Sequence, residues 1–350
     1  MSTTQTHGIN RRSFLKGSAI AGGTMALGLM TGCSSQAQGS EGSEKGSGEG
    51  SSKSEFAQAG PKTFADDYIV SPAAEWEKYA TVENSGLIEG MNFKDGTLWF
   101  IDVAMSNILK VEDGKAVVVY HDDAKKAMPN GAKFIDDTTM LITDRSQGLC
   151  TFDIETLEYK VLIGDFNGSP FLGLNDLVLD GQGGAYFTDP GQSDYLDKNG
   201  NVYYVKYDAA EPEIELYKTG FAYPNGITIS PDANFLYVAE FNTNSILCVP
   251  SKTYVDAKDT PYVAARLSGG HGPDGLLTDA DGNIYAAHLK AGEVVVVDPD
   301  GWDITTVRLP ESAGIFVSNL TIHDGYLYAC EFGQGIIWRI PTSAKQNALG

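Results

Sequence analysis

The chain has 350 residues, with 46 acidic and 25 basic side chains and a formal net charge of −21 at pH 7. Such acidity argues against nucleic acid or an anionic membrane as a partner of the folded part, because both depend on clustered Lys and Arg. A hydrophobic fraction of 42% excludes a disordered chain. The length fits two ordinary domains or one large all-β domain.

The N-terminal segment carries Arg11 and Arg12, followed by an apolar stretch from residue 19 to residue 30 that is rich in Gly and Ala. This pattern resembles a twin-arginine export signal. The stretch ends at Leu-Met-Thr-Gly-Cys, which resembles a bacterial lipoprotein processing site with Cys33 as the lipidated residue. We therefore expect residues 1–32 to be a removable signal and the protein to be a cell-membrane lipoprotein outside the cytoplasm. A secreted or periplasmic protein is the alternative.

Residues 34–53 consist almost entirely of Ser, Gly, Glu, Gln, Ala and Lys. No part of this stretch can bury enough apolar surface to offset the entropy of ordering it. We expect residues 33–60 to form a flexible tether. The later cysteines, Cys150, Cys248 and Cys330, each lie in an apolar run, which predicts three buried thiols rather than a framework of disulfides.

An internal repeat begins after the tether. A polar-Gly or polar-Asp pair (present in the first five copies), an alternating apolar run, a Gly/Asp turn and a second apolar run recur six times. The lead polar residues are Glu89, Asn130, Asn175, Asn225, Asp274 and Asn319. The steps between them, 41 to 50 residues, match a four-stranded propeller blade.

The repeat predicts an all-β fold, a six-bladed β-propeller over residues 61–341 with four-stranded blades, followed by a C-terminal tail at 342–350. The last repeat is about one strand short. We expect the segment 63–80 to supply that outer strand and so to close the ring and cover an open edge.

Propeller geometry gathers the polar positions. The first strand of each blade lines the central channel, so the six lead residues should form an inner ring at one mouth. The return strands should bring a second ring of side chains to the same mouth: Asp102, Asp144, Asp189, Glu240, His288 and Glu331. No basic residue occupies either set. The structural alternative is that such residues only cap strands and satisfy turn amides.

The composition of the inner ring indicates a hard cation. Two carboxylates with several amide oxygens suit Ca²⁺, which takes about 6–8 oxygen ligands. The absence of Cys and His from the inner ring disfavours zinc, copper and iron. Ca²⁺ is the expected cofactor, with Zn²⁺, Mg²⁺ and Mn²⁺ as alternatives.

These residues resemble the family of senescence marker protein, gluconolactonases and related calcium-dependent lactonases. The resemblance covers residues 64–341. Its most specific parts are Ile88-Glu89-Gly90, Asn175-Asp176-Leu177, Tyr186-Phe187-Thr188-Asp189-Pro190, Pro224-Asn225-Gly226 and Pro273-Asp274-Gly275. The resemblance implies that Glu89, Asn175, Asn225 and Asp274 hold one divalent cation. It also implies that Asn130 and Asn319 contact substrate or water.

The family reaction is hydrolysis of a lactone or another ester. Here the cation would polarise the carbonyl and Asp274 would activate water, while Glu89 would act mainly as a ligand. Asn130 and Asn175 would orient the substrate. His288 could assist as a base or simply pack locally. The expected partner is a small lactone or ester, and the expected state is a monomer.

Apolar residues near the expected pocket favour an apolar lactone as much as a sugar lactone: Met91, Met105, Phe171, Phe221 and Phe316. Two other functions stay open. One is a non-catalytic propeller that keeps the ion for rigidity and binds a glycan, a peptide or a partner protein at the cell surface. The other is a different reaction at the axis, such as the condensation run by strictosidine-synthase-like relatives.

Overall fold

Short strands separated by Gly and Asp turns make up nearly all the regular structure of residues 68–124, 126–254 and 261–349, which the computed structural model describes. The predictions for the signal, the tether and Cys33 lie outside the described residues. The chain divides into Met1–Pro61 and Lys62–Gly350. No helix in the described ranges is long and apolar enough to span a membrane.

Four of the sheets are four-stranded antiparallel meanders. The first contains β6 (Pro129–Phe134), β7 (Thr139–Asp144), β8 (Gly148–Asp153) and β9 (Tyr159–Ile163). The second contains β12 (Leu177–Leu179), β13 (Gly184–Asp189), β14 (Gly200–Lys206) and β15 (Glu213–Phe221). The third contains β16 (Pro224–Ile229), β17 (Phe235–Glu240), β18 (Ser245–Pro250) and β19 (Tyr262–Arg266). The fourth contains β20 (Gly272–Thr278), β21 (Ile284–Leu289), β22 (Glu293–Val297) and β23 (Ile304–Arg308).

A fifth, eight-stranded sheet has the order β2-β3-β4-β5-β1-β26-β25-β24. Its strands are β1 (Glu77–Thr81), β2 (Ile88–Lys94), β3 (Thr97–Asp102), β4 (Asn107–Glu112), β5 (Lys115–His121), β24 (Val317–His323), β25 (Tyr326–Glu331) and β26 (Ile336–Pro341). β1 pairs antiparallel with β26 over four residue pairs, but it touches β5 through the single parallel pair Thr81↔Lys115.

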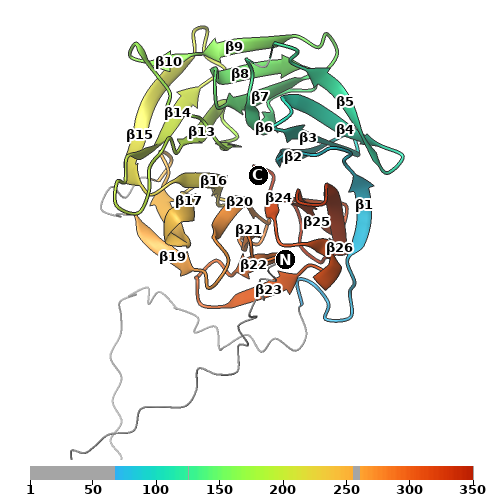
Figure 1. The fold of residues 1–350 in the computed structure, drawn as a ribbon. Coiled ribbons are helices and arrows are strands. Elements are labelled where there is room, and N and C mark those ends of the chain that lie inside the picture. The colour runs from blue at the N-terminus through green and yellow to red at the C-terminus, as the bar shows by residue number, and fades with distance from the viewer. Residues whose placement is uncertain (1–67, 125, 255–260, 350) are drawn as a thin grey trace, which may run out of the picture. The chain divides into compact units, whose positions relative to one another are not determined.

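The sheets stand around a common centre, which gives the described part an all-β, propeller-like fold (Figure 1). A small ribbon, β10 (Asp165–Phe166) with β11 (Ser169–Pro170), and two short 3₁₀ turns, η1 (Phe241–Thr243) and η2 (Glu311–Ala313), complete it. Apolar clusters lie between neighbouring sheets. Tyr237 and Ala239 of β17, for example, pack with Leu276 of β20 and Ala286 of β21. Strands buried on both faces explain the continuous apolar runs in the sequence.

The turns and the cysteines match the sequence. Asp95 and Gly96 have φ angles of 50° and 76°, and both positive values suit a type I′ hairpin turn. Cys150, Cys248 and Cys330 are buried, and no disulfide joins them.

The C-terminal residues are part of the folded unit. Asn347, near the end of the described residues, is buried. Its Nδ2 donates to the carbonyl oxygen of Ile229 at 2.9 Å and to Thr278 Oγ1 at 2.8 Å. Leu349 packs against the apolar cluster that contains Ile229. The tail therefore adds contacts to the neighbouring first strands β16 and β20, which already touch each other through the hydrogen bond from Thr278 Oγ1 to the carbonyl oxygen of Ile229.

We expect Asn347→Ala to lower the free energy of unfolding by about 2 kcal/mol, because it removes two buried hydrogen bonds. Chemical denaturation measures this loss. The exposed neighbour Lys345 serves as the control, since Lys345→Ala removes no such contact. An Asn347→Ala protein as stable as the control would show that the tail contributes nothing to the fold.

Candidate functional site

β-Bulges place the inner-ring side chains. In five of the six repeats, the pairing of the first strand with the second shifts register at or next to the lead residue. The shifts lie between Glu89 and Asn92, Pro129 and Ala132, Pro224 and Ile227, Pro273 and Leu276, and Val317 and Asn319. A bulge adds an unpaired residue and re-aims its side chain. This local feature turns the lead residues toward the channel.

The glycine that follows a lead residue is needed for one of two reasons, its backbone conformation or the close approach of a neighbouring strand. Gly90 has a φ of +58°, which only Gly adopts readily. At Gly226, however, the need is space, because an added Cβ would lie 2.3 Å from the carbonyl oxygen of Asp274. Gly275 likewise faces the Ser318 carbonyl oxygen, at 2.9 Å. Gly90 therefore permits an unusual backbone conformation, whereas Gly226 and Gly275 allow neighbouring first strands to touch.

The six inner-ring residues are all buried, with exposed fractions of 2% to 8%. Glu89 Oε2 accepts a hydrogen bond from Asn319 Nδ2 at 2.8 Å. Asn319 Oδ1 accepts one from the backbone N–H of Met91 at 3.3 Å. Asp274 is hydrogen-bonded to the side chain of Asn225. The structure thus links each carboxylate of the ring to one of its amides.

Both carboxyl groups resist ionisation. Burial raises the pKa of Glu89 well above its usual range, the Asp274 charge adds to this, and the hydrogen bond from Asn319 opposes it. Burial raises the pKa of Asp274 to about 8, against the hydrogen bond from Asn225. A divalent cation would remove this repulsion and stabilise both charged forms.

The donor set fits such a cation. Two carboxylates and several amide oxygens are what a hard divalent ion takes. No group of three or more His, Cys, Asp and Glu side chains able to hold a metal occurs among the described residues. A site here would therefore depend on the amide oxygens as well as on Glu89 and Asp274.

Asp176 is a site residue that the sequence reasoning missed. It follows Asn175 where four other first strands have Gly. Its Oδ1 and Oδ2 accept hydrogen bonds from the backbone N–H groups of Leu177 at 2.9 Å and Ile227 at 3.3 Å. Burial raises its pKa to about 6, against the nearby Lys133 charge. The Asp176 charge in turn raises the pKa of Glu89 and Asp274. The break in the Gly pattern was the available signal.

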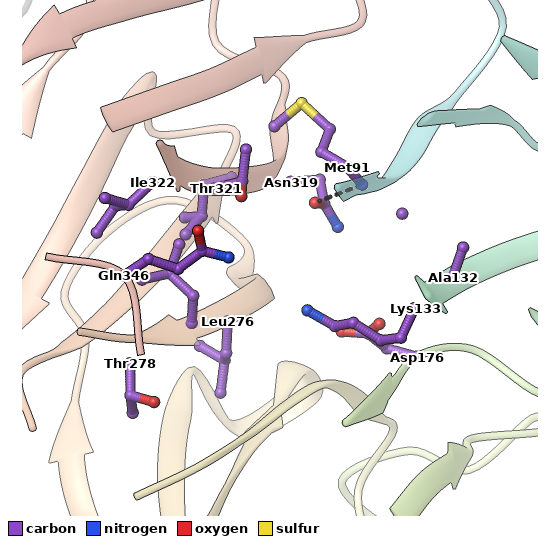
Figure 2. A pocket seen from close by; sticks show the side chains of 13 residues that line it. Met91, Ala132, Lys133, Asp176, Leu276, Thr278, Asn319, Thr321, Ile322 and Gln346 are labelled. Carbon is purple, nitrogen blue, oxygen red and sulfur yellow. Dashed lines mark hydrogen bonds between the residues drawn. The ribbon is translucent and has the colours of Figure 1, made fainter. Parts of the chain in front are cut away.

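Lys133 also reaches the axis. Figure 2 shows Lys133 and Asp176 side by side at a cavity of about 30 Å³. The cavity is also lined by Met91 and Asn319 from the mouth side and by Gln346 from the C-terminal tail. Burial lowers the pKa of Lys133, and the Asp176 charge opposes this. The cavity next to the inner ring is therefore lined by polar and charged side chains as well as by apolar ones.

Arg145 is the third missed residue. It follows Asp144 at the end of β7 and is half-buried. Its positive charge lowers the pKa of Glu89, of Asp274 and of the second-ring Asp189. This does not contradict the absence of basic residues from the ring positions themselves. Arg145 lies one residue beyond the second-ring set and still acts on the site.

The carboxylates of the second ring hold neighbouring loops in place by accepting hydrogen bonds from backbone N–H groups. Asp102 Oδ2 accepts from the backbone N–H of Gly86 at 2.8 Å. Asp144 accepts from Met128 at 2.9 Å and Ser146 at 2.7 Å. Asp189, Glu240 and Glu331 bond loop amides in the same way. These buried acids fit the capping alternative.

His288 is fully buried. Its Nδ1 lies 3.1 Å from Glu293 Oε1, and its Nε2 is so close to Gly270 that a Cβ there would lie 2.5 Å away. This geometry fits local packing.

We expect Asp144→Ala to lower the free energy of unfolding by about 3 kcal/mol, since several buried amide donors lose a charged acceptor. Asp144→Asn should cost less, because one amide oxygen still accepts. Thermal denaturation of both variants checks this order. A loss that is equal for Ala and Asn would point to packing rather than to the hydrogen bonds.

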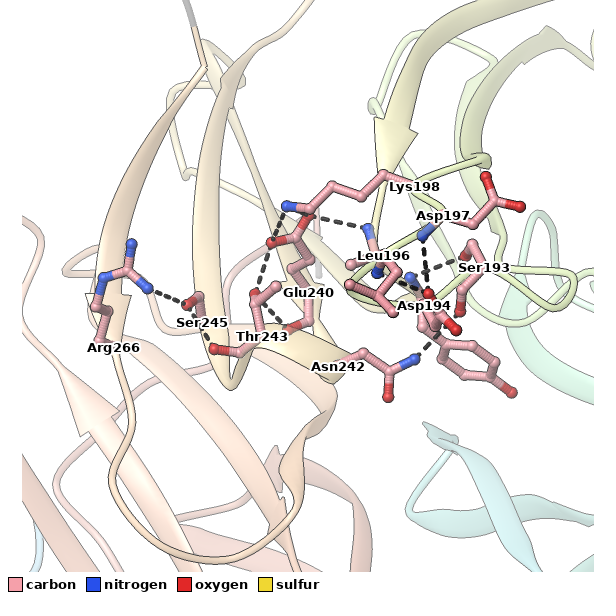
Figure 3. A network of polar contacts seen from close by, with 12 residues as sticks. Ser193, Asp194, Leu196, Asp197, Lys198, Glu240, Asn242, Thr243, Ser245 and Arg266 are labelled. Carbon is pink, nitrogen blue, oxygen red and sulfur yellow. Dashed lines mark hydrogen bonds and ion pairs between the residues drawn. The ribbon is translucent and has the colours of Figure 1, made fainter.

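The loop at 190–199 is tied down beside the third sheet (Figure 3). Lys198 Nζ lies 3.1 Å from Glu240 Oε1, and Thr243 Oγ1 donates to Glu240 Oε2 at 2.6 Å. The loop presents Tyr195 and Leu196 to solvent, with exposed fractions of 67% and 91%. It is fixed at its base and apolar at its tip.

Of the apolar residues expected near the pocket, Met91 lines the cavity and the others lie elsewhere. Met105 is exposed. Phe221 belongs to the apolar core between sheets, and Phe171 packs edge-on against Phe187. Phe316 packs against Phe332 in a tilted arrangement, with ring centroids 5.3 Å apart.

Known proteins match this chain in two parts, the N-terminal signal segment and the all-β part that follows. Residues 8–28 match the twin-arginine translocation signal, which directs export across the cytoplasmic membrane. The lactonase drp35 of Staphylococcus epidermidis is 28% identical over 246 residues, covering 67% of this chain and 73% of the relative. The Staphylococcus aureus protein of the same name is 27% identical, with 67% and 74% covered.

Solved structures share the fold. A gluconolactonase from Xanthomonas campestris superposes with a TM-score of 0.66 at 21% identity, covering 78% of this chain and 91% of the other. A calcium-binding regucalcin from Agrobacterium tumefaciens gives 0.63 at 21% identity, with 76% and 97% covered. Residues 87–322 match the SMP-30/gluconolactonase/LRE-like region, and the chain belongs to that family.

Proposed function

We propose that this protein hydrolyses lactones or related esters at the inner ring, in a reaction that depends on a divalent cation, Ca²⁺ in the first instance. The observation that carries the proposal is the pair of buried carboxyl groups, Glu89 and Asp274, whose pKa values are both raised. Similarity to proteins named lactonase and gluconolactonase, and to one named calcium-binding, supports the reaction class and the ion.

Glu89, Asn175, Asn225 and Asp274 would hold the cation. When bound, it would supply Lewis-acid polarisation of the substrate carbonyl. Asp274 would accept the proton of the attacking water at a carboxylate oxygen, and its hydrogen bond to Asn225 would fix the orientation of that carboxylate. Glu89 would mainly hold the ion, with its position set by Asn319. Asn130, Asn175 and Asn319 would orient the substrate.

The architecture around the site is part of the proposal. The eight-stranded sheet would count as two blades joined at Thr81↔Lys115. With the four separate sheets this makes a six-bladed ring over residues 61–341, in which β1 supplies the outer strand of the last blade. Cys33 would carry the lipid, the segment 33–60 would be the tether, and the propeller would act as a monomer.

The test is a panel of γ- and δ-lactones and aryl esters, assayed with the protein before and after treatment with a chelator, beside Asp274→Ala. We expect turnover that disappears with the chelator and returns with Ca²⁺. Turnover that survives both chelation and Asp274→Ala would contradict the mechanism. If no compound reacts while Ca²⁺ still raises the melting temperature, the protein is a non-catalytic binding module.

A further inference from the structure

Arg145 occupies a position of the repeat that is apolar in all the other copies. β7 ends at Asp144, which pairs with Pro129 next to the inner-ring residue Asn130. Arg145 comes directly after it, and its backbone N–H donates to the carbonyl oxygen of Met128 at 2.9 Å. The residues that follow the second ring in the other repeats are all apolar: Val103, Pro190, Phe241, Leu289 and Phe332. A charged side chain is therefore not required there by the fold.

The two second-ring acids nearest Arg145, Asp144 and Asp189, accept hydrogen bonds from backbone N–H groups, although Asp189 Oδ1 is buried without a hydrogen-bond partner. Asp144 accepts hydrogen bonds from Met128, Ser146 and Gln147 N–H groups. Asp189 Oδ2 accepts from the N–H of Leu172 at 2.9 Å. In the described part of the chain, no ion pair or side-chain hydrogen bond engages the Arg145 guanidinium. A half-buried arginine thus keeps five N–H donors beside the inner ring.

The surroundings strengthen any contact that these donors make. Met128, which directly precedes β6, is 38% exposed, and Leu172, between β11 and β12, is 53% exposed. Gly173, next to Leu172, approaches the Arg145 carbonyl oxygen: a Cβ built there would lie 3.8 Å away. Apolar neighbours lower the local dielectric constant, and a planar guanidinium binds a carboxylate through two parallel hydrogen bonds.

We propose that Arg145 binds a carboxylate on the substrate, so that the protein prefers lactones that carry one anionic group over neutral lactones. This inference rests on the proposed lactone hydrolysis. In the reaction, water adds to the lactone carbonyl carbon, the ring C–O bond breaks, and the ring oxygen leaves as an alcohol after taking back the proton from Asp274. The substrate carboxylate stays unchanged and serves only to orient the ring.

A purely structural role for Arg145 is the competing explanation. Its charge lowers the pKa of Glu89 and Asp274 and could merely offset their repulsion. Such a role would change stability and the rates on all substrates together. It would not change the ratio of the rates on charged and neutral lactones.

The experiment compares γ-butyrolactone with its γ-carboxylate, which is hydrolysed to 2-hydroxyglutarate. The readout is the ratio of kcat/KM for the charged lactone to kcat/KM for the neutral one. We expect wild type to prefer the charged lactone and Arg145→Gln to reduce the ratio about 30-fold, as for the loss of a charge-assisted bidentate contact. Arg145→Lys should give an intermediate ratio. Arg266→Gln, at the end of β19, is the matched control and should keep the ratio.

Calorimetric titration with 2-hydroxyglutarate and with 1,5-pentanediol adds a readout that needs no turnover. Binding of the dicarboxylate alone, lost in Arg145→Gln, supports the proposal even if neither lactone is hydrolysed, and in that case only the proposed reaction fails. A wild type that hydrolyses both lactones with equal kcat/KM overturns the proposal and leaves the lactonase function standing. So does a ratio that Arg145→Gln leaves unchanged. If wild type neither hydrolyses a lactone nor binds the dicarboxylate, both ideas fall.

Discussion

Asp274→Asn is expected to reduce kcat/KM for lactone hydrolysis at saturating Ca²⁺ by about 10³-fold or more, because loss of a general base alone typically costs about 10²- to 10⁴-fold. The substitution also removes one of the two charges that would hold the cation. Asn has nearly the same shape as Asp, and its amide oxygen can still accept the hydrogen bond from Asn225, so the β-bulge should persist.

Circular dichroism would show that the variant is folded. The matched control is Asp281→Asn, an exposed acid in the hairpin turn that follows the same strand. We expect this control to retain full activity. If Asp274→Asn hydrolysed lactones at the wild-type rate, the reaction would take place away from the axial ring.

The second large effect is a fall in stability as pH rises when divalent cations are absent. The folded pKa of Asp274 is about 8, far above that of an unfolded aspartate, and that of Glu89 is raised as well. Between about pH 4 and pH 8 the folded state therefore keeps protons that the unfolded chain has released. Because the folded state binds more protons there, the free energy of unfolding decreases as pH increases, and the loss should reach several kcal/mol.

Thermal denaturation in the presence of a chelator measures this effect. We expect the melting temperature to fall from pH 5 to pH 8, with Asp176 and Asp189 adding to the lower half of the range because each has a pKa of about 6. Asp274→Asn should flatten the dependence. Added Ca²⁺ should raise the melting temperature more at pH 8 than at pH 5. A wild type equally stable at both pH values without cations would contradict the burial of charge that we describe.

The sequence predicted the strands and the inner ring because their signals are local. Alternation of apolar residues indicates strands, and Asp-Gly pairs such as Asp95-Gly96 indicate tight turns. Because the repeats have similar lengths and the same order of strands, equivalent residues lie at the same end of each sheet. Glu89 and Asp274 lie 185 residues apart in the chain, yet the electrostatic effect of Asp274 on Glu89 shows that the repeat brings them together.

The missed features depend on contacts between repeats. Lys133 sits in an alternating strand like any solvated lysine, and only the packing of β6 against the neighbouring first strand brings it to Asp176. Arg145 lies one residue past the periodic pattern and so escaped comparison. Asn347 is in a segment without a repeat signal, and its burial arises from Ile229 and Thr278, more than 60 residues away. None of these contacts recurs from repeat to repeat, so a search for periodic patterns in the sequence does not reveal them.

The most direct test of the cation-dependent hydrolase is a calcium titration of the metal-stripped protein, in which bound Ca²⁺ and lactone hydrolysis are measured on the same samples. We predict that activity rises in proportion to bound Ca²⁺ and saturates at one ion per chain. Glu89→Gln and Asp274→Asn should both weaken the binding. Full hydrolysis by protein that holds no divalent ion, or one bound ion unaffected by both substitutions, would contradict the assignment of the site to the axial ring.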